Sequence, residues 1–146
     1  MNREEELDTE EYQIFLRGSS GELIDSVVTL VQEEDDSARL ELSFGEIHLS
    51  AVAPDFFDAF AQVRRRLWER KILPLCYGAS RNVFPSPMSR DMGGGVKAYR
   101  LTLGQHAKRE DLVFLFDTGP DIEPVTPEEQ EEFYERWVAS PRPPYT

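Results

Sequence analysis

Apolar and polar residues alternate most regularly in the run Arg39-Leu40-Glu41-Leu42-Ser43-Phe44-Gly45-Glu46-Ile47-His48-Leu49-Ser50-Ala51. A period of two places Leu40, Leu42 and Phe44 on one face of a strand, and the same spacing resumes after Gly45. The run therefore predicts a tight β-hairpin in an antiparallel sheet that has one buried face and one wet face.

Two further strands are expected upstream of this hairpin. Residues 12–18 and 23–31 are rich in β-branched and aromatic side chains, and the acidic residues 33–36 form a turn before the hairpin. Residues 1–11 are strongly acidic and have few apolar side chains, so we predict a flexible tail there.

The hydrophobic period changes to that of a helix after the hairpin. Between Pro54 and Lys71, Phe56, Phe60, Val63 and Leu67 are spaced as on one helix face. A second helix is predicted where Thr126 and Glu129 form a capping box and Pro127 occupies the first helical position.

The remaining segments complete the expected architecture. Residues 98–103 and 112–116 have the composition of strands, and the proline-rich residues 140–146 suggest a loose end. We therefore expect one α+β domain over residues 1–146, with an antiparallel sheet of about six strands and two helices packed on one face.

Length and composition exclude several classes of protein. The chain of 146 residues has the size of one domain, and its apolar runs are shorter than the roughly 20 residues that span a bilayer. The acidic start does not resemble a secretory signal. The single cysteine, Cys76, fits a reducing compartment, so we expect a cytoplasmic protein without membrane association.

The charged residues are distributed unevenly along the chain. Residues 1–63 carry 16 acidic and 3 basic side chains, residues 64–109 carry 2 and 11, and residues 110–146 carry 10 and 2. Two interpretations stay open: the fold brings the opposite charges together, or it leaves an acidic face or an anion-binding pocket.

The segment from Leu75 to Lys97 has no long period and is the first candidate for a functional site. Ser86 followed by Pro87 predicts a short helix over residues 87–92 that stops at Gly93. We expect Met88 and Met92 to face the interior of the protein.

The same segment offers donors for an anion or a protein partner, since arginines form bidentate bonds to carboxylates and phosphates and serines add hydroxyl groups. The alternative is an ordered structural loop whose arginines pair with Asp91, Asp117 or the two acidic arms of the chain, residues 1–63 and 110–146. The candidate ligand- or partner-binding residues are Arg81, Asn82, Ser86, Ser89 and Arg90.

Other kinds of chemistry have weaker support. Cys76 could act as a nucleophile with His48 or His106 as base and Asn82 as orienting group, but it lies in an apolar run that is typical of a buried cysteine. With two histidines and one cysteine, we expect no metal site and no cofactor.

The basic run Arg64-Arg65-Arg66 does not predict nucleic-acid binding. Three consecutive residues spread around a helix, and a net charge of −12 repels a polyanion.

The motifs Cys76-Tyr77-Gly78, Arg81-Asn82-Val83-Phe84-Pro85-Ser86, Arg90-Asp91-Met92-Gly93 and Lys97-Ala98-Tyr99 together resemble a known class. They are similar to small bacterial proteins that are encoded beside polymorphic toxins and interpreted as immunity proteins. The resemblance covers about residues 75–137 and carries no catalytic residue. It implies a cytoplasmic protein that binds a partner and catalyses no reaction.

Three functions follow, in order of support. The first is a non-enzymatic interaction module, an immunity protein that neutralises a basic toxin, for which an acidic surface speeds the encounter. The second is a small-anion-binding or regulatory domain that uses residues 78–95, and the third is an enzyme that uses Cys76. A homodimer stays open.

Overall fold

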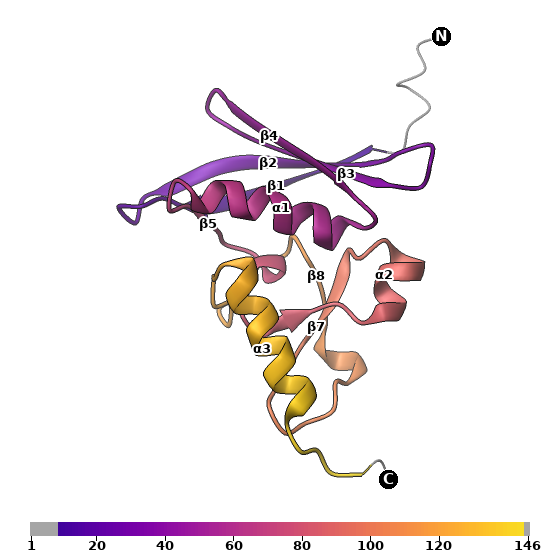
Figure 1. Ribbon diagram of the computed structural model, residues 1–146. Helices are drawn as coiled ribbons and strands as arrows, with labels where there is room; N and C mark the ends of the chain where they lie inside the picture. Colours follow the sequence, from indigo (N-terminus) through magenta and orange to yellow (C-terminus); the bar gives the residue numbers. More distant parts are fainter. Residues whose placement is uncertain (1–8, 145–146) are drawn as a thin grey trace.

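A five-stranded antiparallel sheet forms one side of the molecule in the computed structural model, which describes residues 9–144 (Figure 1). Its strands lie in the order β4-β3-β2-β1-β5, so four consecutive strands pair with their neighbours in sequence. Gly45, at φ +56°, turns the chain between β3 and β4 as the hairpin prediction requires. The strands of this sheet are β1 (Thr9–Arg17), β2 (Leu23–Gln32), β3 (Ala38–Phe44), β4 (Ile47–Ala53) and β5 (Leu73–Pro74).

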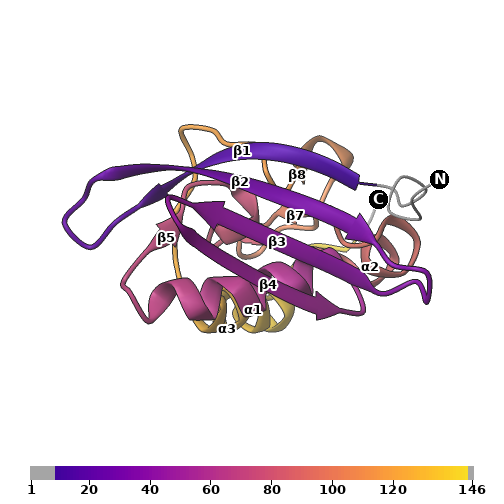
Figure 2. The same cartoon turned by 90° about the horizontal axis from the view of Figure 1, so that it is seen from above.

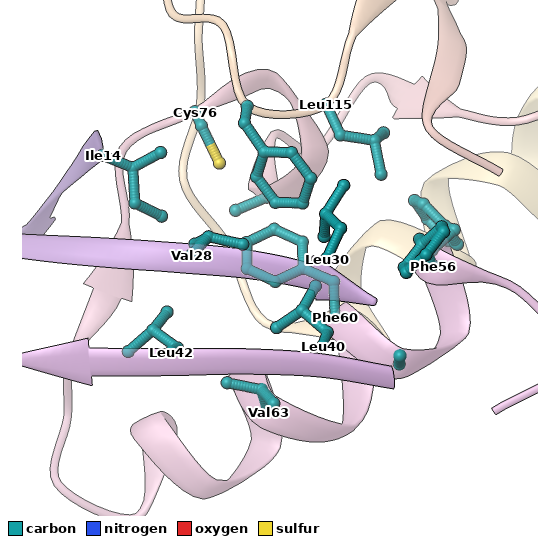
Figure 3. Close-up of a cluster of buried hydrophobic side chains, with 14 of the residues drawn as sticks. Ile14, Val28, Leu30, Leu40, Leu42, Phe56, Phe60, Val63, Cys76 and Leu115 are labelled. Carbon is teal, nitrogen blue, oxygen red and sulfur yellow. The ribbon is translucent and has the colours of Figure 1, made fainter. Parts of the chain in front are cut away.

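Helix α1 (Phe56–Trp68) covers one face of this sheet and contacts β3 and β4 (Figure 2). Alternate residues of the strands point toward it, which is why Leu40 and Leu42 are fully buried. Phe60 and Val63 of α1 meet them in the hydrophobic core (Figure 3). Because α1 lies between the large sheet and the rest of the chain, it is buried on two sides (Figure 1).

A smaller unit packs on the other side of α1 (Figure 1). It contains a three-stranded antiparallel sheet in the order β6-β7-β8, and α3 lies against β6 and α1. Its elements are η2 (Tyr77–Ala79), β6 (Val83–Phe84), α2 (Pro87–Gly93), β7 (Lys97–Arg100), η3 (Arg109–Asp111), β8 (Leu112–Phe114) and α3 (Pro127–Ala139).

The α+β class is confirmed, whereas the arrangement within it differs from the expected single sheet. The described strands form two sheets, and α3 covers the smaller sheet instead of lying beside α1 on the larger one. The strands β5 and β6 have two residues each. Such short strands produce no periodic signal, so the sequence hides the break between the two sheets.

Part of each predicted tail is ordered in the structure. Residues 9–11 belong to β1, so only residues 1–8 of the expected N-terminal tail lie outside the described residues. At the other end, the guanidinium of Arg142 lies 4.3 Å from the ring centre of Trp137, and His106 Nε2 lies 2.5 Å from the Pro143 carbonyl oxygen.

Candidate functional site

Arg81 follows η2 and is paired with carboxylates from the C-terminal part of the chain. Its Nε lies 3.4 Å from Glu123 Oε2, and its Nη2 lies 3.8 Å from Glu129 Oε2. The neighbouring Asn82 accepts a hydrogen bond from Ser80 Oγ through its Oδ1 at 2.9 Å. Both candidate residues therefore have intramolecular partners.

Arg90 holds α2 against the start of α1. Its Nη1 lies 3.1 Å from Asp55 Oδ2 and 3.0 Å from Asp58 Oδ1, and its guanidinium stacks over the rings of Phe57 and Phe84. Asp55 also caps α1, because its Oδ1 accepts the Asp58 backbone N–H at 2.8 Å. One carboxylate thus fixes both helices.

Ser86 and Ser89 act locally within α2. Ser86 Oγ accepts the backbone N–H of Ser89 at 3.1 Å, which confirms the predicted N-cap. The predicted stop is shifted by one residue, since Gly94, at φ +70°, is the C-cap.

The five candidate residues are thus held by different parts of the fold. Arg81 pairs with carboxylates near α3, whereas Arg90 pairs with those at the start of α1. An anion at either arginine would have to compete with these carboxylates. The arrangement favours the structural interpretation of these two arginines over an anion pocket.

The basic middle segment, residues 64–109, pairs with the acidic residues 110–146 at two further positions. Arg65 Nε lies 2.7 Å from Glu128 Oε1, and Arg100 Nη1 lies 3.3 Å from Asp121 Oδ2. The hydrogen bond from Arg65 lowers the pKa of Glu128. The hydrogen bond that the Tyr77 hydroxyl donates lowers the pKa of Asp121, and Arg100 adds to the effect. The fold therefore brings opposite charges together, as the first interpretation of the charge pattern proposed.

Arg64 is the most unusual side chain of the interior because it is only 2% exposed and its hydrogen bonds go to neutral groups. Its guanidinium donates to Gln130 Oε1 at 2.7 Å, to the Val125 carbonyl at 2.8 Å and to the Gly78 carbonyl at 3.1 Å. Burial lowers the pKa of Arg64 to about 10. Its Nε has no hydrogen-bond partner.

Gln130 completes this buried polar network. Its Nε2 donates to the carbonyls of Ser80 and Val83, each at 2.8 Å, and to that of Gly78 at 3.1 Å. Arg64 and Gln130 thereby fix the backbone of the segment that contains η2. The sequence could have predicted the burial of Arg64, because this residue lies on the same helix face as Phe60 and Leu67. No such pattern predicts the burial of Gln130.

Cys76 lies in the hydrophobic core (Figure 3). Burial raises the pKa of its thiol to about 12, so the thiol stays protonated near neutral pH. His48 lies on the solvent side of β4, where its ring contacts Ser43 and Glu41. This environment does not activate Cys76 as a nucleophile.

The methionines of α2 point to solvent, so the expectation that they face the interior is wrong. Met88 is 70% exposed and Met92 is 82% exposed. The reason is the ion pairing of Arg90: this residue is two positions from each methionine, about 200° around the helix, and it takes the inward side. Two large apolar side chains thus lie on one exposed face.

Two cavities flank Met92. The first has a volume of about 330 Å³ and is lined by the apolar residues Leu30, Phe56, Val96 and Phe114 and by the polar residues Glu10 and Gln32, among others. The second has a volume of about 310 Å³ and is more polar; its lining includes Gln32, Asp36, Arg90 and Asp91. We call this surface the methionine face and define it by Met88, Asp91 and Met92 of α2 together with Glu10, Gln32 and Asp36.

A separate aromatic groove lies beside α3. It has a volume of about 280 Å³ and is lined by Phe84, Tyr99, Tyr134 and Trp137, among other residues. Phe84 and Tyr134 are stacked with ring centres 4.0 Å apart. The residues that line this groove carry no charge, and they include the candidate residue Ser86.

Within residues 9–144, no cluster of three or more histidine, cysteine, aspartate or glutamate side chains has the form of a metal site. In the same part of the chain, every helix is too short or too polar to cross a membrane.

Comparison with known proteins gave no match, either to a protein-family model or to a curated protein.

Proposed function

We propose that this chain is a non-enzymatic interaction module that binds a basic protein partner. Its specific form would be an immunity protein that neutralises a toxin encoded beside it in a bacterial genome. The observation that carries the proposal is the methionine face, where Met88 and Met92 are exposed on a helix among acidic side chains. Methionine adapts to varied partner surfaces, and acidic neighbours favour a cationic partner.

The charge of the molecule supports the same function. The net charge is −12, and several arginines of the basic middle segment already face carboxylates of this chain. The remaining field is therefore negative and would speed the encounter with a basic protein. A cytoplasmic location belongs to this proposal, since the partner would be neutralised inside the producing cell.

The two other functions have less support. A small-anion site would need Arg81 and Arg90, and both are paired with carboxylates. A cysteine-dependent enzyme would need an ionised and accessible Cys76, whereas this thiol is buried and its pKa is raised to about 12.

The test is direct binding to the product of the adjacent toxin gene. The purified chain is titrated with the purified toxin domain by calorimetry at low and high salt, and an unrelated acidic protein of similar charge serves as control. We expect a stoichiometric complex that weakens with salt, and survival of cells that express both proteins.

Two results would contradict this proposal. One is that no basic protein is recovered stoichiometrically with the tagged chain from its native host. The other is a rise in thermal stability with phosphorylated or carboxylated metabolites alone, which would put the anion site in its place.

A further inference from the structure

We propose that the methionine face is the docking surface for the basic partner, and that it accepts an apolar side chain and an adjacent lysine or arginine in the two cavities that flank Met92. This inference rests on the proposed function and gives it a place and a chemistry. The occupant is a protein segment in which a cationic residue lies next to an apolar one.

The first cavity suits the apolar side chain. Phe56, Val96 and Phe114 line it, and Met92 forms part of its wall. Because Met92 is 82% exposed, covering it removes apolar surface from water, which is the main favourable contribution to association. An unbranched thioether can also adjust to the shape of the side chain that enters.

The second cavity suits the cation. Asp36 and Asp91 both line it, and Gln32 adds a polar group. Arg90 is the one basic side chain among its lining residues, and Asp55 and Asp58 already oppose its charge. The local charge therefore favours a lysine or arginine and disfavours an acidic residue.

Helix α2 is fixed in place although its methionines are free. Gly94 accepts the Phe56 backbone N–H through its carbonyl at 2.8 Å, and Gly95 donates its own N–H to the Ser89 carbonyl at 3.0 Å. Together with the ion pairs of Arg90, the Phe56–Gly94 bond attaches the middle and the C-terminal end of α2 to the start of α1. A partner would therefore meet a surface whose backbone is already ordered, which reduces the entropy lost on binding.

The experiment observes the methionine methyl groups directly. The chain contains three methionines, so a sample labelled with ¹³C at the methionine methyl carbon gives a simple spectrum, and Met88→Leu and Met92→Leu assign two of its signals. The probes are short synthetic peptides with one leucine flanked by lysines, the same peptide with glutamates for lysines, and the same peptide with glycine for leucine. NMR detects contacts even at a Kd of about 1 mM.

The expected result is that only the lysine–leucine peptide shifts the signals of Met88 and Met92. Asp36→Asn/Asp91→Asn should weaken its binding about fivefold, whereas the matched change Glu132→Gln/Glu135→Gln on α3 should leave it unchanged. Asparagine is chosen at position 36 because Asp36 has φ +68°, a conformation that asparagine tolerates.

Two outcomes would overturn the inference. One is that the lysine–leucine peptide leaves both methionine signals unchanged; the other is that all three peptides shift them equally. A separate measurement distinguishes this failure from failure of the proposed function. If the toxin domain binds the wild type and Met92→Ala with equal affinity, the function stands and the docking surface lies elsewhere; if it binds neither, the function itself is wrong.

Discussion

Arg64 is a buried cation whose hydrogen bonds go to carbonyl oxygens instead of a carboxylate. Three oxygen atoms, from Gly78, Val125 and Gln130, accept its hydrogen bonds. These oxygens belong to η2, to α3 and to Val125 before it, so the arginine connects α1 to both η2 and α3. Its contribution is to specify where that unit packs.

We expect Arg64→Ala to lower the free energy of unfolding by about 3 kcal/mol. The change opens a cavity and leaves buried acceptors on Val125 and Gln130 without a donor. The neighbouring Arg65→Ala removes an exposed ion pair with Glu128 and should cost under about 1 kcal/mol. Urea denaturation of both variants measures the difference, and equal losses would show that the network does not stabilise the fold.

The buried thiol of Cys76 makes stability depend on alkaline pH. Its pKa is about 12 in the folded protein against 9.0 as the ordinary value, so between pH 9 and 10 the unfolded chain loses a proton that the folded chain keeps. The free energy of unfolding should therefore fall as pH rises, by up to about 1.4 kcal/mol per pH unit.

The measurement for Cys76 is chemical denaturation at several pH values between 8 and 10. The variant Cys76→Ala should give a flatter pH dependence. Limiting the range to pH 10 avoids most of the opposite effect of Arg64, whose pKa is lowered from 12.5 to about 10. Rapid reaction of the folded thiol with a disulfide reagent at pH 8 would contradict the burial on which this prediction depends.

At the scale of elements, three consecutive glycines, residues 93–95, lead from α2 to β7. Gly95 matters more to this connection than Gly93 does. A Cβ atom at Gly95 would lie 3.1 Å from Asp55 Oδ1, and the backbone there has φ +73°. A Cβ atom at Gly93 would meet nothing within 4 Å, and Gly93 is the last residue of α2. Asp55 is the shared partner of α1 and Arg90, so a disturbance at Gly95 reaches both helices.

We expect Gly95→Ala to destabilise the protein by about 1–3 kcal/mol, because alanine is strained at positive φ and would push against Asp55. Gly93→Ala should change stability by less than about 1 kcal/mol and can raise it, since alanine favours the helix. Thermal unfolding of the two variants side by side provides the measurement. An equal effect at both positions would refute the special role of Gly95.

The elements show which features a sequence can predict. Ser86 and Thr126 were identified as helix caps because capping depends on residues three positions apart. The hairpin at Gly45 was predicted for the same local reason. The direction of Met88 could not be predicted, since it depends on Arg90 reaching Asp55, a residue 35 positions away.

The sequence directs attention to the irregular segment 75–97, but it does not show how the side chains of that segment are paired. The irregular segment 75–97 does contain the exposed helix, but the residues chosen for their chemistry, Arg81 and Arg90, are paired with carboxylates of this chain. Glu10, Gln32 and Asp36 of the methionine face come from distant strands and turns. A single sequence does not reveal which of its distant residues become neighbours.

At the scale of the whole molecule, the basic residues 64–109 form ion pairs with both acidic segments of the chain. We therefore expect acid pH to lower the stability of the fold. Asp121 and Glu128 have pKa values below their ordinary 3.8 and 4.5, which means that the folded state holds protons less tightly than the unfolded state. Their contribution to stability is present above about pH 4.5 and is lost as pH falls through their folded pKa values.

Thermal unfolding between pH 3 and 6 checks this prediction. We expect the unfolding temperature to fall toward pH 3, and Asp121→Asn to show a smaller fall because it removes one of the titrating groups. A melting temperature that is constant over this range would show that the ion pairs between the segments contribute nothing to stability.

The Arg64–Gln130 bond has a consequence for the order in which the protein is made. Gln130 is 66 positions after Arg64, so a ribosome adds it roughly 3–13 s later. Once residue 78 has been added, the nascent chain contains α1 and all strands of the large sheet, and until Val125 is added only one acceptor of Arg64, the Gly78 carbonyl, has been made. The large sheet can therefore form early, whereas the smaller unit on the other side of α1 stays incomplete until α3 is synthesised.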